Sequence, residues 1–343
     1  MHTSIEHWLS QTLARGGSDL HLSAGAHPMA RVLGELQTLD AAPINSDALA
    51  NELKTLLPDW LAQDHDDAVA IQGLGRFRVN VFAQARGWSS VWRCIPEQIP
   101  RLQDLNMPVC LPQWLQHPNG LLLVTGATGS GKSTTLAALL AHLNHTQPLH
   151  ILTLEDPIEF VHHSQRSLVQ QRNVPGHSAD FATALRAALR QDPDVILVGE
   201  LRDLDTIRLA LSAAETGHLV LGTLHTVSAA KTIDRIVDVF PGDEKEMVRA
   251  MLSESLQAVI SQTLIKTKDG NGRVAAHEIM LGTPAIRNLI REAKVAQMYS
   301  AIQTGSSVGM QTLDANLMEL VRRNQISMGS ARSAAKMPEN FSG

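Results

Sequence analysis

One stretch of the chain, Gly126 to Ser133, restricts its fold more than any other. It reads Gly-Ala-Thr-Gly-Ser-Gly-Lys-Ser, which is the phosphate-binding pattern of a glycine, four free positions and then Gly-Lys-Ser. Residues 120–125 before it are an apolar run of strand length, and residues 134–143 after it have the pattern of a helix. Strand, glycine-rich turn and helix follow in the required order, so the sequence predicts binding of a nucleoside triphosphate.

Each part of this stretch has a chemical role. Glycines let the backbone approach the phosphates, while backbone N–H groups and the positive end of the helix dipole face them. Lys132 adds a mobile positive charge, and Ser133 is expected to place its hydroxyl on Mg²⁺.

Composition excludes several classes of protein. A net charge of −5 argues against a generic polyanion-binding surface, so no stable nucleic-acid partner is expected. The only cysteines, Cys94 and Cys110, indicate neither a disulfide framework nor a thiolate zinc site, as is typical of a reducing cytoplasm. The N-terminus lacks the apolar core of a signal peptide, and no window approaches a membrane-spanning apolar run. We therefore expect a soluble, cytoplasmic protein that reaches a membrane only through partners.

The chain is expected to have an α/β fold in four parts. Residues 1–95 indicate a small α+β domain, and five prolines in 96–118 predict a semi-rigid linker. Residues 119–273 alternate strand-like and helical segments, which is typical of a parallel sheet flanked by helices. Residues 274–343 have a helical pattern to the end.

Two apolar strands run into acidic residues. The segment 150–159 leads to Glu159, and the segment 194–203 places Glu200 directly after four apolar residues and a glycine. A carboxylate at a strand end beside bound phosphates can orient Mg²⁺ through its water shell or polarise the attacking water. The alternative for each is a loop carboxylate that caps a helix.

A third strand, 219–224, is bracketed by His218 and His225. A buried histidine is usually a core residue, but a neutral imidazole at a strand end could hydrogen-bond the γ-phosphate and report its presence. His225 is the candidate for that role. Metal binding by these histidines is not expected, because no ligand cluster completes the set.

In this order, the four elements resemble the secretion ATPases of the type II and type IV pilus superfamily. The similarity extends from residue 18 to about residue 340 and is strongest to the retraction ATPases of type IV pili. The segment 285–292 resembles their retraction motif, whereas pilus extension and secretion ATPases usually carry a tetracysteine zinc insert that is absent here. The other segments that carry the resemblance are 18–25, 76–80, 230–235 and 309–314.

The resemblance implies a homohexamer of subunits with an N-terminal PAS-like domain and a C-terminal RecA-like ATPase core, with ATP held at the seam between them. It implies Glu159 as general base, Glu200 as the Mg²⁺ partner and His225 as γ-phosphate sensor, although the two glutamates could exchange roles. The implied nucleotide ligands are Gly126, Ala127, Thr128, Gly129, Ser130, Gly131, Lys132, Ser133 and Thr134.

Two N-terminal arginines, Arg78 and Arg93, resemble those that reach the phosphates when the domains close and would then stabilise transition-state charge. The alternative is that both are solvated strand arginines. The segment 64–72 departs from the acidic and aromatic alternation usual in the family, but it touches none of the motifs.

The implied activity is ATP hydrolysis that disassembles pilin polymers and so powers twitching motility. It would act at the cytoplasmic face of the inner membrane, with the pilus platform protein as partner. In the segment 285–292, we expect Ile286, Leu289 and Ile290 to pack the C-terminal helices and Arg287 to contact a neighbouring subunit or the pilus base. The alternatives are a pilus assembly or secretion ATPase, a DNA-translocating RecA-like motor, and an accessory protein that hydrolyses nucleotide poorly.

Overall fold

The computed structural model describes residues 3–95, 98–108 and 111–341. The chain divides into two compact units. The first contains the residues up to Gln98 together with Pro157–Val161, and the second contains Ile99–Asp156 and the residues from His162 onward.

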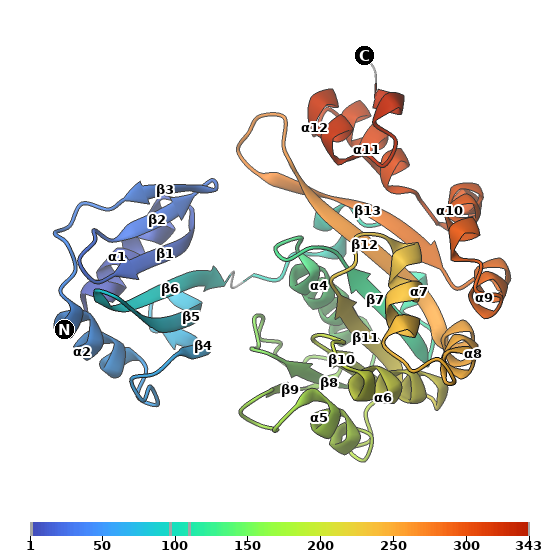
Figure 1. Cartoon of the computed structure of the whole chain (residues 1–343), viewed down its shortest axis with the longest axis horizontal. Helices are drawn as coiled ribbons and strands as arrows, with labels where there is room; N and C mark the ends of the chain where they lie inside the picture. The colour runs from blue at the N-terminus through green and yellow to red at the C-terminus, as the bar shows by residue number, and fades with distance from the viewer. Residues whose placement is uncertain (1–2, 96–97, 109–110, 342–343) are drawn as a thin grey trace. The chain divides into compact units, whose positions relative to one another are not determined.

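The first unit is an antiparallel sheet of order β3-β2-β1-β6-β5-β4 with two helices packed on it (Figure 1). Its elements are α1 (Ser4–Ala14), β1 (Gly17–Ser23), β2 (Met29–Val32), β3 (Glu35–Thr38), α2 (Ser46–Leu56), β4 (His65–Ile71), β5 (Gly75–Gln84) and β6 (Gly87–Ile95).

Alternation along β5 separates the two faces of this sheet. Phe77, Val79 and Val81 are buried in the core that also contains α1 and α2. Since successive strand residues point to opposite faces, Arg78 lies on the face away from that core. Arg78 also pairs with Arg93 of β6, so the two arginines that are predicted from the sequence to reach the phosphates are direct cross-strand neighbours.

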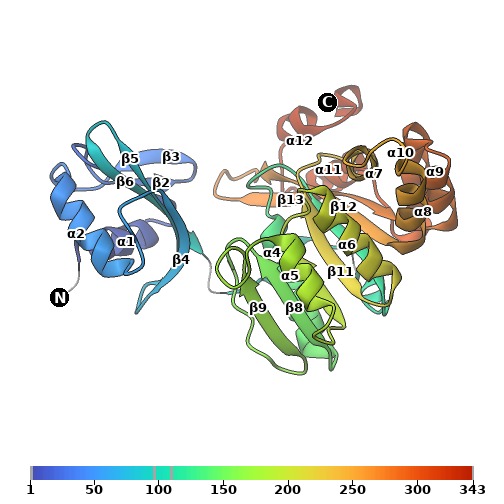
Figure 2. The same cartoon turned by 60° about the horizontal axis from the view of Figure 1, so that its bottom comes forward.

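The second unit is built on a seven-stranded sheet of order β13-β12-β7-β11-β10-β8-β9, with helices around it (Figures 1 and 2). Neighbouring strands are parallel except for β13, which pairs antiparallel with β12. Its strands are β7 (Gly120–Thr125), β8 (His150–Glu155), β9 (Leu168–Asn173), β10 (Val195–Val198), β11 (Leu219–Leu224), β12 (Leu256–Lys266) and β13 (Arg273–Leu281).

The helices of this unit pack around the sheet and form its C-terminal part. The α-helices are α3 (Leu111–Trp114), α4 (Lys132–Thr146), α5 (Phe181–Ala188), α6 (Leu204–Glu215), α7 (Ala229–Asp238), α8 (Lys245–Ser255), α9 (Pro284–Arg291), α10 (Val295–Thr304), α11 (Leu313–Arg322) and α12 (Met328–Ala334). The 3₁₀-helices are η1 (Leu102–Leu105), η2 (Gly305–Val308) and η3 (Pro338–Phe341).

The sequence pattern misassigns two stretches. The helical pattern expected from residue 274 onward is wrong for residues 274–281, because β13 forms a full antiparallel ladder with β12 there, but the elements from Pro284 onward are helical as expected. A short apolar run buried on both faces does not distinguish strand from helix by periodicity, and pairing with β12 decides its conformation. Part of the predicted linker also packs in the core of the second unit, since Leu102, Leu111 and Trp114 are buried there. Pro96 and Cys110 lie outside the described residues.

The segment 285–292 forms most of α9, and its apolar side packs as expected. Ile286 and Ile290 are fully buried, and Leu289 packs against the same core. Arg287 differs from the expectation, because its guanidinium is used inside the chain. It donates to the carbonyls of Gly282 at 2.6 Å, Ser253 at 2.6 Å and Leu256 at 2.9 Å, and also to that of Glu254.

The carbonyls of Ser253, Glu254 and Leu256 lie at the end of α8 and the start of β12, where a helix leaves its last C=O groups without intrahelical partners. The carbonyl of Gly282 directly follows β13. The five donors of a guanidinium suit such a cluster. Partial burial lowers the pKa of Arg287 from its ordinary value, but the group stays charged.

We expect Arg287→Ala to lower the free energy of unfolding by about 2–3 kcal/mol, because charge-assisted hydrogen bonds are lost and partly buried carbonyls lose their donor. Arg291→Ala is the matched control on the same helix. Arg291 forms an exposed ion pair with Glu254 at 2.8 Å, and its loss should cost less than about 1 kcal/mol. Urea denaturation measures both variants, and equal losses would contradict the capping role of Arg287.

A second prediction concerns His277 of β13, which has no exposed surface and no hydrogen-bond partner for either ring nitrogen among the described residues. Burial lowers the pKa of His277 to about 4. In the unfolded chain, His277 has its ordinary pKa of 6.5. Between pH 4 and pH 6.5 the unfolded chain therefore binds more protons at this residue than the folded chain does. The contribution of the neutral His277 to the free energy of unfolding is therefore fully present above pH 6.5, and it is lost as the pH drops toward 4.

His277→Gln should remove roughly 3 kcal/mol of this acid-induced loss. Denaturant titrations between neutral and acidic pH measure it, with the exposed His117→Gln as control. If both variants keep the pH profile of the parent protein, the buried neutral imidazole does not contribute to acid sensitivity.

Candidate nucleotide-binding site

The carboxyl ends of neighbouring parallel strands bring the predicted groups of the second unit to one edge of the sheet. β7 leads into the phosphate loop at Gly126, β10 leads to Glu200 through Gly199, and β11 leads to His225. β7 pairs with β11, and β11 pairs with β10, so these three strand ends are successive neighbours. An open α/β sheet binds its ligands at this kind of edge.

The phosphate loop has a backbone conformation that depends on glycine. Gly126, Gly129 and Gly131 have φ values of 146°, 77° and 89°, in the region that favours glycine. Gly131 is the N-cap of α4, and no side chain caps this helix end. Lys132 folds back over the loop and donates to the carbonyls of Gly126 at 2.8 Å and Ala127 at 3.0 Å.

These residues fit a phosphate group. The uncapped start of α4 presents N–H groups and the positive end of a helix dipole. The hydroxyls of Thr125 and Ser130 are buried and have no partner among the described residues. Ser133 lies in the first turn of α4, where its hydroxyl can bind a cation that accompanies the phosphates. A bound nucleotide would supply the scissile phosphate bond, and Mg²⁺ would neutralise its charge.

Glu200 is held by two cationic or proton-donating side chains. Its carboxylate lies 2.6 Å from the guanidinium of Arg202 and 3.0 Å from Nε2 of His225. Burial alone would raise the pKa of Glu200, but the hydrogen bond and charge of Arg202 together with His225 outweigh it and keep that pKa below its ordinary value. Glu200 is therefore an ionised carboxylate at neutral pH. Only the ionised form can bind hydrated Mg²⁺ or accept a proton.

Glu159 and Arg78 come together in the first unit. Arg76 donates to the carbonyls of Ile158 at 3.2 Å and Glu159 at 3.4 Å, and a nitrogen of Arg78 lies 4.0 Å from the Glu159 carboxylate. Arg78 also makes a bidentate contact with Asp66 of β4, with distances of 3.0 and 2.9 Å.

Arg93 has its own carboxylate partner. Its Nε donates to the buried Asp19 of β1 at 3.0 Å. The cross-strand pair of like charges formed by Arg78 and Arg93 is thus offset by one acidic residue on each side of it. Neither arginine is a purely solvated strand residue.

Three residues that contact the predicted site residues are not predicted from the sequence. Asp66 lies in the segment 64–72, which departs from the family pattern, and Arg202 stands two residues after Glu200. The third is Gln262 of β12, which contacts the phosphate loop. The contact between Asp66 and Arg78 can be predicted only once β4 and β5 are known to pair. Gln262 lies about 130 residues beyond the loop, so no local sequence pattern indicates its contact with the loop.

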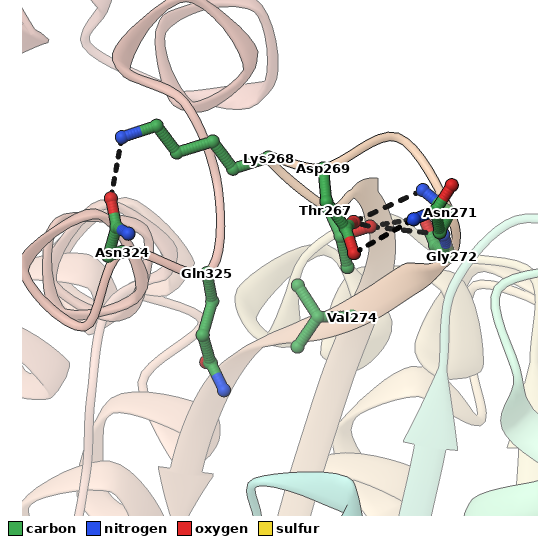
Figure 3. Close-up of a pocket in the computed structure, with 8 residues that line it drawn as sticks. All are labelled: Thr267, Lys268, Asp269, Asn271, Gly272, Val274, Asn324 and Gln325. Atoms are coloured by element: carbon green, nitrogen blue, oxygen red, sulfur yellow. Dashed lines mark hydrogen bonds between the residues drawn. The ribbon is translucent and has the colours of Figure 1, made fainter.

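A shallow pocket lies at the turn between β12 and β13 (Figure 3). Thr267 donates to Asp269 at 2.6 Å, and Lys268 reaches Asn324 at 2.5 Å. Its polar groups are used within the turn and toward the end of α11, and no predicted site residue lines it.

The comparisons with known proteins agree with this geometry. The family model described as "Type II/IV secretion system protein" matches residues 74–283. The chain belongs to this family. It is 58% identical to the type IV pilus retraction ATPase PilT of Pseudomonas aeruginosa, over 98% of this chain and 99% of the relative. It is 53% identical to a twitching motility protein of Neisseria gonorrhoeae, over 92% of this chain and 86% of the relative.

The solved structures give the same result. The crystal structure of the pilus retraction motor PilT with bound ADP superposes with a TM-score of 0.86 at 41% identity, and 99% of each chain is covered. The predicted α/β fold class, an N-terminal domain followed by a RecA-like ATPase domain, is confirmed. Over the described ranges, no helix is long and apolar enough to cross a membrane, and no group of three or more His, Cys, Asp or Glu residues could hold a metal ion.

We expect Lys132→Ala to weaken ATP binding roughly 10- to 100-fold, because a charge-assisted contact to phosphate is worth about 1.5–3 kcal/mol. Titration with a fluorescent ATP analogue measures the affinity. Lys294→Ala is the control, since Lys294 is an exposed lysine paired with Glu292 at 2.8 Å. Unchanged affinity in Lys132→Ala would contradict the assignment of this loop.

Proposed function

We propose that this protein is an ATP-hydrolysing motor that retracts type IV pili and so powers twitching motility. The observation that carries the proposal is the 58% identity to a pilus retraction ATPase over nearly the whole length of both chains. The phosphate loop and the carboxylate and histidine at the neighbouring strand ends support the hydrolytic part of the proposal.

Within this proposal, residues 126–134 bind ATP and Ser133 places its hydroxyl on Mg²⁺. Glu200 orients Mg²⁺, partly through water, and His225 senses the γ-phosphate, consistent with the 3.0 Å contact between them. Glu159 acts as general base. Arg78 and Arg93 stabilise negative charge on the transferred phosphate after they exchange their carboxylate partners for it.

The working assembly is a homohexamer, as the family resemblance implies. It acts in the cytoplasm at the inner-membrane face of the pilus base, where the pilus platform protein and pilin machinery are its partners. Hydrolysis does work when ATP binding changes the conformation of the protein and loss of the γ-phosphate reverses that change.

Deletion of the gene in the source organism tests the proposed function, with surface pili counted by electron microscopy and twitching scored on agar. We expect excess pili and no twitching. Complementation with the native gene should restore twitching, whereas Glu159→Gln or Glu200→Gln should not, because loss of general-base or electrostatic catalysis costs roughly 100- to 10,000-fold in rate. Lys294→Ala serves as the control variant and should restore twitching.

Other outcomes separate the alternatives. Bald cells would indicate a pilus assembly ATPase, and a secretion defect with normal pili would indicate a secretion ATPase. Turnover of the purified protein that depends on DNA would indicate a DNA-translocating motor. Restored twitching with both glutamate variants would contradict a mechanism that requires hydrolysis at this site.

A further inference from the structure

Gln262 of β12 lies directly behind the phosphate loop. β12 pairs in parallel with β7, and this ladder aligns Ile260 with Val124 and Ser261 with Thr125. Gln262 is therefore level with Gly126, the first residue of the loop. Gln262 is only 4% exposed, so the oxygen and the nitrogen of its side-chain amide must be satisfied inside the protein.

Both polar atoms of this amide contact the junction between the loop and α4. Nε2 of Gln262 donates to the carbonyl of Ser130 at 2.5 Å, and Oε1 accepts from the hydroxyl of Thr135 at 2.8 Å. A carbonyl can only accept a hydrogen bond, so the amide nitrogen must be the atom that faces Ser130. The hydroxyl of Thr135 then serves the amide oxygen, and this fixes the orientation of the whole side chain.

The loop backbone also packs against Gln262. A Cβ atom at Gly126 would lie 2.3 Å from the backbone oxygen of Gln262, and one at Gly131 would lie 3.0 Å from its Nε2. Gly126 is thus required on the side of the loop that faces β12, and a side chain at Gly131 would press on the amide of Gln262. This is a steric demand in addition to the positive φ values of both residues.

The bond from Gln262 to Ser130 has a consequence for the next amide group. In a trans peptide unit, the C=O and N–H groups point in opposite directions. Because the Ser130 carbonyl is turned toward β12, the Gly131 N–H of the same peptide unit is turned away from β12. None of the described residues accepts a hydrogen bond from this N–H. It remains available to an anion in the loop.

From these contacts we infer that Gln262 is a positioning residue for nucleotide binding. It holds the Ser130–Gly131 peptide unit in the orientation in which its N–H faces the phosphates. It also ties that unit to the first turn of α4 through Thr135. The inference rests on the nucleotide binding assumed in the proposed function, and it adds a residue outside the phosphate-loop motif.

The strand contains a matched control. Gln257, near the opposite end of β12, also donates to a carbonyl beside a glycine of β7, since its Nε2 contacts the Asn119 oxygen at 3.1 Å. A Cβ at Gly120 would lie 2.5 Å from Cγ of Gln257. Gln257→Leu therefore removes a similar hydrogen bond from the same strand pair without touching the loop.

The test measures affinity for a fluorescent ADP analogue by titration, and KM and kcat for ATP, in the full-length protein. Gln262→Glu keeps an acceptor for Thr135 but replaces the donor to Ser130 with a carboxylate oxygen that repels its carbonyl. We expect it to weaken ADP binding and raise KM about tenfold, the effect of one hydrogen bond. Gln262→Leu should show at least the same loss, and Gln257→Leu should bind ADP like the parent protein.

Thr135→Val is the second arm and covers the case in which the Gln262 variants fold poorly. It removes only the bond on the helix side, so the affinity should fall by less than in Gln262→Glu. Unchanged ADP affinity in a folded Gln262→Glu protein, or an equal loss in Gln257→Leu, would overturn the positioning role. If the Gln262 variants do not fold, parent-like affinity in Thr135→Val would overturn it. Absence of ADP binding by the parent protein would instead refute nucleotide binding and the proposed function with it.

Discussion

The candidate site depends on the parallel pairing of β7 with both β11 and β12. This pairing places the carboxyl ends of the strands at one edge of the sheet, so the phosphate loop, Glu200 and His225 arise from neighbouring strands. The same register brings Gln262 level with the start of the loop. A slip of one residue would turn each side chain to the opposite face of the sheet, and the buried strands of this core would not tolerate it.

Charged side chains of the predicted site share one feature: Glu200, Arg78 and Lys132 each contact an oppositely charged side chain or backbone carbonyls. Glu200 lies between Arg202 and His225, Arg78 is held by Asp66, and Lys132 rests on two loop carbonyls. Contacts of this kind keep the side chains oriented, and partners that bind more strongly, such as phosphates, can replace them. Side chains that release one partner to bind another need this property.

Local sequence predicts much of the fold and the positions of the motifs. The phosphate loop is recognisable because its glycines, lysine and serine act within a few residues of one another. β13 is not, since its apolar residues are buried on both faces and show no period that separates strand from helix. The sequence pattern predicts an outside partner for Arg287. It does not show the carbonyls at the end of α8, because only the folded chain brings them within reach of the guanidinium.

The sequence by itself determined the class of ligand and the family, because phosphate binding requires particular residue types at short spacing. It also determined which strands end in acidic residues or histidine. Only the tertiary structure decided which of these side chains meet and what holds them. Asp66, Arg202 and Gln262 act through contacts that strand pairing and loop geometry create, and Gln262 reaches the loop across more than a hundred residues of chain. Side chains that act across such separations carry no local pattern, so the sequence alone could not place them.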